Sequence, residues 1–230
     1  MKQLTTVALV CISYFVIVII IFHFLRPELS PIGRPTSEYA VGPYGFLMTT
    51  AFFSMSAASF SLLVGLHKGI ASPAQSRIGL FLLGIWGVGV LVAMTFRIDP
   101  EGSELTTAGT IHRINGPLSF LSLTLSAFLI SRSFRRDVNW QPFYHSALTL
   151  SLIMIAMFII TGVNVTAETG FGGLCQRTFL VVFVTWFILT TLHLRTDDRE
   201  IRVISTINSS LIQLNLGVNV WAIQIHSLPI

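Results

Sequence analysis

Three ionisable residues have the types that proton transfer and anion binding require, and each lies at the end of a long apolar segment. Asp99 follows one such segment, His112 precedes the next, and Arg177 opens the last. A carboxylate and an imidazole at facing helix ends can act as a general acid–base pair, as two metal ligands, or as a structural hydrogen-bonded pair. We predict that Asp99, His112 and Arg177 form one polar site with a catalytic role. Two candidate ligands alone do not indicate a metal.

The guanidinium of Arg177 is the most informative charge. An ionised group close to hydrocarbon is costly unless it is paired. Its expected partner is a carboxylate (Glu38, Asp99 or Glu168), or else an anionic headgroup or substrate. The simpler interpretation is that its side chain reaches out to the membrane interface.

Four further residues are candidates for substrate binding because they fall at the same helix ends. Glu38, Tyr39 and Tyr44 precede the second apolar segment, and Glu168 precedes the sixth. Helix ends on one side of a membrane meet in a bundle, although they are far apart in the sequence. The pattern therefore favours an outward-facing polar pocket that engages a lipid or another amphipathic substrate.

The elements that must position these residues are six apolar segments, at 7–25, 45–66, 78–96, 116–130, 147–163 and 174–194. A transmembrane helix needs about 20 apolar residues, because the hydrocarbon core is about 30 Å thick and a helix rises about 1.5 Å per residue. Five segments meet that length, and the fourth must borrow flanking residues. The composition, 53% hydrophobic and 10% charged, agrees. We predict an all-α, polytopic bundle of six transmembrane helices over residues 1–195.

The distribution of basic residues predicts the orientation. With a cytoplasmic N-terminus, nine Lys and Arg residues fall inside and five outside. Basic residues concentrate in cytoplasmic loops, so both termini are predicted to be cytoplasmic in the cell inner (plasma) membrane. The net charge of +4 is then a topology signal, and the lipid bilayer rather than a nucleic acid is the expected partner.

Residues 196–230 are predicted to form a cytoplasmic or interfacial tail. From residue 203 onward there is no Asp, Glu, Lys or Arg, whereas amide side chains recur at Asn208, Gln213, Asn215, Asn219 and Gln224. Such a segment is too polar to span comfortably, and we expect it to be dispensable for the bundle.

Four short motifs resemble those of a family of bacterial and archaeal membrane proteins known as domain of unknown function 998. They are Ser-Glu-Tyr-Ala to Gly-Pro-Tyr-Gly at 37–45, and the stretches 96–99, 109–112 and 174–177. The resemblance covers about residues 5–195. It implies a six-helix membrane fold with Asp99, His112 and Arg177 as characteristic polar positions, and it brings no activity or cofactor.

Two other functions stay open. The same groups could gate a small solute in a transporter or binding protein, although the span centres carry few charges. A b-type haem protein would use histidines in two layers, which are His23 and His112 near the outer boundary and His67, His145 and His193 near the inner one. Whether the protein is an enzyme, which cofactor it takes and which proteins it contacts are left open by the sequence.

Overall fold

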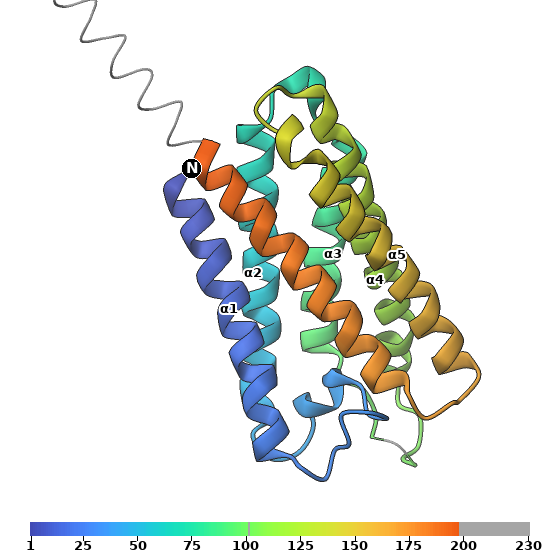
Figure 1. Cartoon of the computed structure of the whole chain (residues 1–230). Helices are drawn as coiled ribbons and strands as arrows, with labels where there is room; N and C mark the ends of the chain where they lie inside the picture. The colour runs from blue at the N-terminus through green and yellow to red at the C-terminus, as the bar shows by residue number, and fades with distance from the viewer. Residues whose placement is uncertain (101, 198–230) are drawn as a thin grey trace, which may run out of the picture.

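Each of the six apolar segments forms one helix that is long and apolar enough to cross a bilayer (Figure 1). The computed structural model describes residues 1–100 and 102–197. Its long helices are α1 (Lys2–Leu25), α2 (Gly45–Gly69), α3 (Arg77–Thr95), α4 (Thr107–Ser133), α5 (Tyr144–Thr166) and a sixth helix, Gly172–Asp197. The prediction of an all-α, polytopic membrane protein is confirmed.

The fourth helix extends well beyond its apolar centre. The apolar stretch covers 116–130, whereas α4 begins at Thr107 and ends at Ser133. Its first turn is capped by Thr106, whose side chain accepts a hydrogen bond from the backbone N–H of Gly109 at 3.0 Å. The added turns carry polar residues such as His112 and Asn115, which face α3 instead of lipid.

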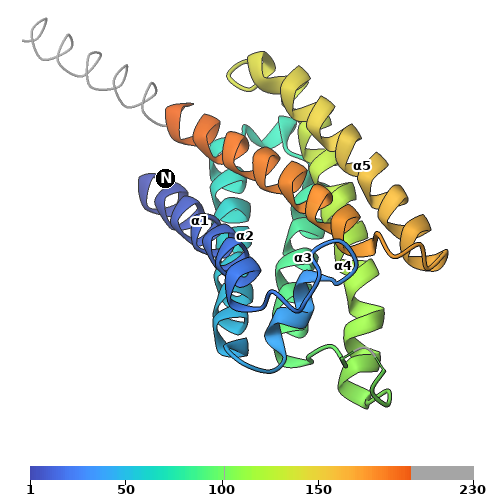
Figure 2. The ribbon, with the colours of Figure 1, turned by 60° about the horizontal axis from the view of Figure 1, so that its bottom comes forward.

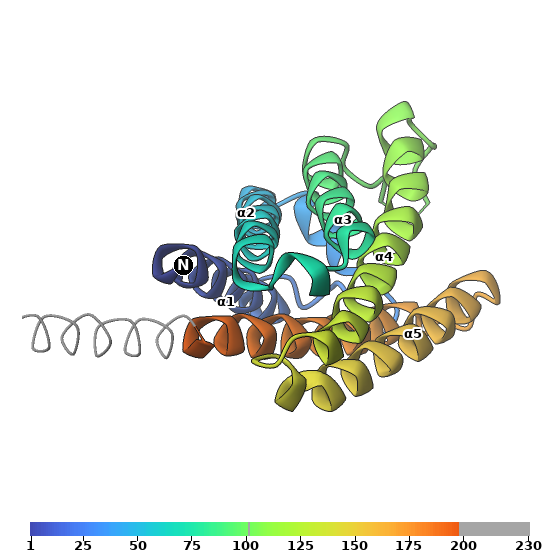
Figure 3. The same ribbon diagram turned by 90° about the horizontal axis from the view of Figure 1, so that it is seen from above.

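Consecutive helices pack against one another along α1 to α5, and the sixth helix lies across the first four (Figure 3). Trp186 of the sixth helix donates its indole N–H to the Ser131 hydroxyl of α4 at 2.9 Å. Phe183 packs edge to face on Trp86 of α3, with ring centroids 5.7 Å apart. These contacts close the bundle on one side, while α5 is the most exposed of the helices.

The bundle has two different ends, visible in Figures 1 and 2. The N-terminus and the end of the sixth helix share one end with the turns 70–76 and 134–143, and we call it the terminal end. The loops 26–44, 96–106 and 167–171 lie at the opposite end, which we call the loop end. An even number of spans requires this arrangement. Which end is cytoplasmic stays a prediction, and the predicted tail lies outside the described residues from 198 onward.

Candidate functional site

The structure places all seven predicted site residues at the loop end, but it divides them among separate hydrogen-bond networks. One network surrounds Arg177 on the sixth helix, and another joins the ends of α3 and α4 around Asp99 and His112. Figure 2 shows the loop 26–44, which carries Glu38, Tyr39 and Tyr44, turned toward the viewer at this end.

The Arg177 side chain uses almost all of its hydrogen-bond donors to contact other groups of the protein. Its Nη1 donates to the backbone carbonyls of Pro31, Arg34 and Gly173, at 2.8, 2.7 and 3.2 Å. Its Nη2 donates to the Tyr39 hydroxyl at 3.0 Å, and the guanidinium carbon lies 5.6 Å from the centroid of the same ring. The sequence predicts a carboxylate partner, whereas the partners in the structure are backbone carbonyls, the Tyr39 phenol and an imidazole. With the imidazole contact described next, the guanidinium uses four of its five N–H groups, which are one on Nε, two on Nη1 and one on Nη2.

His23 of α1 completes this network, and no pattern in the sequence connects it with Arg177. Its Nδ1 lies 2.7 Å from the Ile19 carbonyl, so Nδ1 carries the proton. The lone pair on Nε2 then accepts from Arg177 Nε at 3.2 Å. The Ile19 carbonyl of α1 thus selects the Nδ1–H tautomer of His23, in which Nε2 is free to accept from Arg177.

The loop 26–44 is fastened to the start of the sixth helix by further contacts. The Gln176 side-chain oxygen accepts from both the backbone N–H and the hydroxyl of Thr36, at 2.9 and 3.2 Å. Gly173 must be glycine, because a Cβ there would lie 2.4 Å from the Arg34 carbonyl oxygen. The short helix η1 (Thr36–Ala40) is consequently buried along its whole length.

The predicted substrate-binding residues have dissimilar surroundings. Glu38 is 8% exposed and accepts from Arg34 Nε at 2.7 Å. Tyr39 is 1% exposed and stacks on Phe22, with ring centroids 4.7 Å apart. Tyr44 and Glu168, in contrast, are exposed and lie outside the Arg177 network. A role for these residues in substrate binding stays a prediction.

Asp99 and His112 hold the α3–α4 connection. The Asp99 carboxylate accepts from the backbone N–H and the hydroxyl of Thr106, both at 2.8 Å, just before α4 begins. The His112 ring, 8% exposed, lies with Nδ1 2.8 Å from the Phe96 carbonyl at the end of α3. Asp99 is also close enough to act electrostatically on His112. The hydrogen bonds of Arg177 go to His23, Tyr39 and backbone carbonyls of the sixth helix and the loop 26–44, and those of Asp99 and His112 go to Thr106 and Phe96. A catalytic role for the three residues stays a prediction.

His112 is the first member of a polar stripe on α4 that the sequence analysis did not single out. The α4 polar stripe recurs every three or four residues and comprises His112, Asn115, Ser119, Ser122 and Ser126. Asn115 donates to the Gly89 carbonyl of α3 at 2.9 Å, and Ser126 donates to the Gly79 carbonyl at 2.8 Å. The 3.5-residue period is a signal that sequence reasoning could have used, since it marks one helix face.

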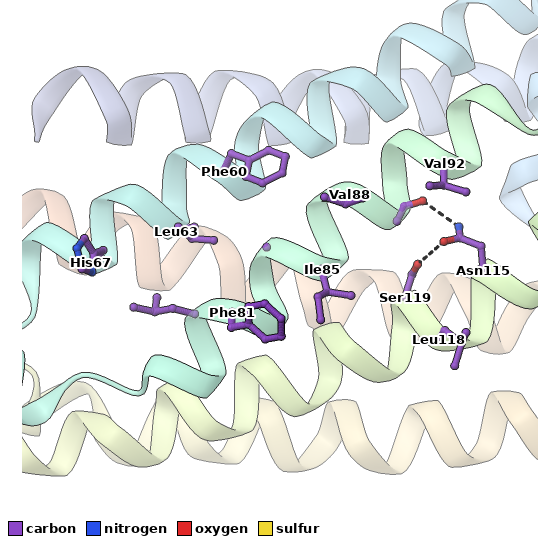
Figure 4. A pocket seen from close by; sticks show the side chains of 13 residues that line it. Phe60, Leu63, His67, Phe81, Ile85, Val88, Val92, Asn115, Leu118 and Ser119 are labelled. Carbon is purple, nitrogen blue, oxygen red and sulfur yellow. Dashed lines mark hydrogen bonds between the residues drawn. The ribbon is translucent and has the colours of Figure 1, made fainter.

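An open groove of about 590 Å³ lies between α2, α3 and α4 (Figure 4). Phe60 and Leu63 of α2 form one wall, and Ile85 and Val88 of α3 lie along its length. His67 stands at its terminal end, and the Asn115–Ser119 pair, 3.1 Å apart, closes the other end. The groove is apolar apart from those two ends, and it lies within the part of the bundle that spans the membrane.

The contacts of His23 bear on the haem alternative. Nε2 of His23 accepts from the Nε–H of Arg177, so binding of iron by His23 would require this hydrogen bond to break. The haem alternative stays a prediction. Among the described residues, no group of three or more His, Cys, Asp or Glu side chains is placed to hold a metal ion.

The fold thus defines a multi-pass integral membrane protein with six helices and an open, largely apolar groove. The chain belongs to the family described as protein of unknown function (DUF998), whose sequence profile matches residues 9–193. Neither a curated protein nor a solved structure matches the chain.

Proposed function

We propose that this protein binds a lipid-like, amphipathic molecule of the bilayer, with its acyl chain in the groove between α2, α3 and α4. The groove volume of about 590 Å³ carries this proposal. It falls in the range of about 300–1,000 Å³ that is usual for small-molecule sites. Nothing in the contacts of the described residues favours the solute-transporter alternative over it.

The shape of α3 supports an acyl chain as the occupant. One face of α3 is buried against the bundle, as Leu83 and Trp86 show, whereas Phe81 and Val88 on the other face are 69% and 52% exposed. Gly84 lies between Phe81 and Val88 on α3, and because it has no side chain it deepens the groove at that point. Such a surface inside the hydrocarbon region meets lipid tails before it meets any water-soluble ligand.

The predicted polar residues support this function by position. Asp99 and His112 fix the outer ends of α3 and α4, and Arg177 fastens the loop 26–44 over the bundle. We assign them as positioning residues for the helices that form the groove. The excess of basic residues on one side supports a cytoplasmic terminal end, and the cell inner (plasma) membrane stays the predicted location.

A bulky side chain in the groove tests the proposal. Val88→Trp fills the groove from its exposed face, and native mass spectrometry in mild detergent then counts the lipids that stay bound. We expect wild-type protein to retain a lipid and the variant to retain at least about fivefold less, because about 1 kcal/mol of lost chain burial corresponds to that ratio.

Val181→Trp is the matched control. Val181 is a 65% exposed valine on the sixth helix, away from the groove. This variant should retain lipid as the wild type does. Equal retention by both tryptophan variants, or no retained lipid in the wild type, would refute the proposed function.

A further inference from the structure

We infer that the groove selects a lipid with an anionic headgroup, held at the terminal end by Lys68 and Arg77, with its chain running along α3 toward Asn115. This inference rests on the proposed function and adds the charge of the headgroup and the leaflet from which the lipid comes. The leaflet is the one on the side of the terminal end.

Two basic residues are helix neighbours of the residues that line the terminal end of the groove, which we call its mouth. Arg77 precedes the groove residue Phe81 by four positions on α3, so the two share a helix face one turn apart. Lys68 follows His67, which lines the groove at this end. The side chains of Lys68 and Arg77 are both exposed. On α3, the apolar residues that line the groove therefore follow an exposed arginine by one helical turn.

The turn between α2 and α3, which separates Lys68 from Arg77, is held by hydrogen bonds of its own. Gln75, between α2 and α3, donates through Nε2 to the carbonyls of His67 and Ile70, both at 2.7 Å. These bonds tie the turn that leads to Arg77 back onto the end of α2, next to Lys68. Two cations that approach one phosphate from neighbouring helices need such a preformed arrangement.

The exposed charges on the described residues of the terminal end are positive. Among the described residues of the terminal end, the exposed charged side chains are all basic, and they are Lys2, Lys68, Arg77, Arg132, Arg135 and Arg136. The acids of this end, Asp137 and Asp197, are 9% and 8% exposed. Asp137 accepts from the backbone N–H of Ala71 at 3.0 Å. The loop end is different, because exposed acids such as Glu104 and Glu168 stand there beside exposed arginines.

The length of the groove fits one leaflet. Its lining residues on α3 run from Leu80 to Val92, which at 1.5 Å per residue is about 18 Å. Half of the hydrocarbon core is about 15 Å. A lipid with its phosphate at Arg77 thus places its chain along the groove and its chain end near Asn115 and Ser119.

Competition between two lipids tests the inference. Purified wild-type protein is incubated with an equimolar mixture of phosphatidylglycerol and phosphatidylcholine that carry identical acyl chains, and native mass spectrometry measures the ratio retained. A basic side chain near an anionic surface contributes about a fivefold preference. We expect phosphatidylglycerol to be retained about tenfold or more over phosphatidylcholine, and the double variant Lys68→Gln/Arg77→Gln to bring the ratio close to one.

The control removes the same charge from the same end. Arg135→Gln/Arg136→Gln changes two exposed arginines of η3 (Phe134–Arg136), a segment that adjoins no groove-lining residue in the sequence, and should keep the preference. A wild-type ratio near one, a preference that persists in Lys68→Gln/Arg77→Gln, or an equal loss in the control would each overturn the inference while the groove still binds lipid. If the wild type retains neither lipid, the proposed function itself fails.

Discussion

At the scale of single residues, the loop end depends on hydrogen bonds from one guanidinium to three separate parts of the chain. Arg177 reaches α1 through His23, the loop 26–44 through Pro31, Arg34 and Tyr39, and its own helix through Gly173. Such a planar fork fixes several acceptors in one geometry, which a lysine ammonium does not.

We therefore predict that Arg177→Lys keeps the charge but lowers the free energy of unfolding by at least about 2 kcal/mol, since several charge-assisted hydrogen bonds are lost. Thermal unfolding of the protein in detergent measures this. Arg113→Lys, at an exposed arginine of the same end, should be nearly neutral. Equal stability of the two variants would show that the Arg177 network is dispensable.

His23 supplies a second prediction, because its Nε2 is an acceptor and not a charge. His23→Phe leaves Arg177 Nε without its partner and should destabilise the protein by about 1–3 kcal/mol. His23→Gln keeps an oxygen that can accept, so it should recover part of that loss in the same unfolding measurement. A glutamine variant no more stable than the phenylalanine variant would count against the assigned tautomer.

At the scale of the helices, α3 is held by donors from both neighbours to its glycine carbonyls. Ser56 of α2 donates to Gly87, and Asn115 and Ser126 of α4 donate to Gly89 and Gly79. Glycines let the backbones come close, and in lipid the resulting interhelical hydrogen bonds contribute to association. This arrangement fixes the spacing of the three helices that form the groove.

The prediction at this scale is that Asn115→Ala destabilises the bundle by about 1 kcal/mol, the size of a typical hydrogen bond between membrane helices. Asn164→Ala is the control, because the Asn164 amide donates to Ile160 of its own helix at 2.9 Å and accepts from Thr169 just after that helix at 2.6 Å, so these two hydrogen bonds do not join it to another helix. Unfolding in detergent compares the two. A larger loss for Asn164→Ala would contradict the role given to the α4 polar stripe.

The helices could be predicted from the sequence because their lengths and apolar composition are local properties. The partners of Arg177 could not, since three of them are backbone carbonyls that any residue supplies. The extent of α4 was uncertain for a related reason. His112 and Asn115 look too polar for a span until their acceptors on α3 are known. The groove depends on which face of α3 is left uncovered, and that is a property of the packed bundle.

At the scale of the whole molecule, the two ends differ in exposed charge, and this difference bears on orientation. Among the described residues, the exposed charged side chains of the terminal end are all basic, whereas the loop end exposes Glu28, Glu104 and Glu168 beside Arg97 and Arg113. The basic excess expected for a cytoplasmic face is thus a feature of the folded surface as well as of the sequence. It also sets the leaflet from which an anionic lipid would enter the groove.

The predicted orientation, with the terminal end cytoplasmic, can be tested by cysteine labelling in intact cells. The natural cysteines, Cys11 and Cys175, are half-buried and unpaired, and serine replaces both first. A probe cysteine at Ser103, exposed in the loop end, should react with a membrane-impermeant maleimide. One at Val138, 81% exposed in the 134–143 turn, should react only after the cells are opened. Ser133 would be a poor choice at that end, because it is 1% exposed and would stay unlabelled in either orientation. Labelling of Val138→Cys but not Ser103→Cys in intact cells would reverse the orientation and move the anionic-lipid mouth to the outer leaflet.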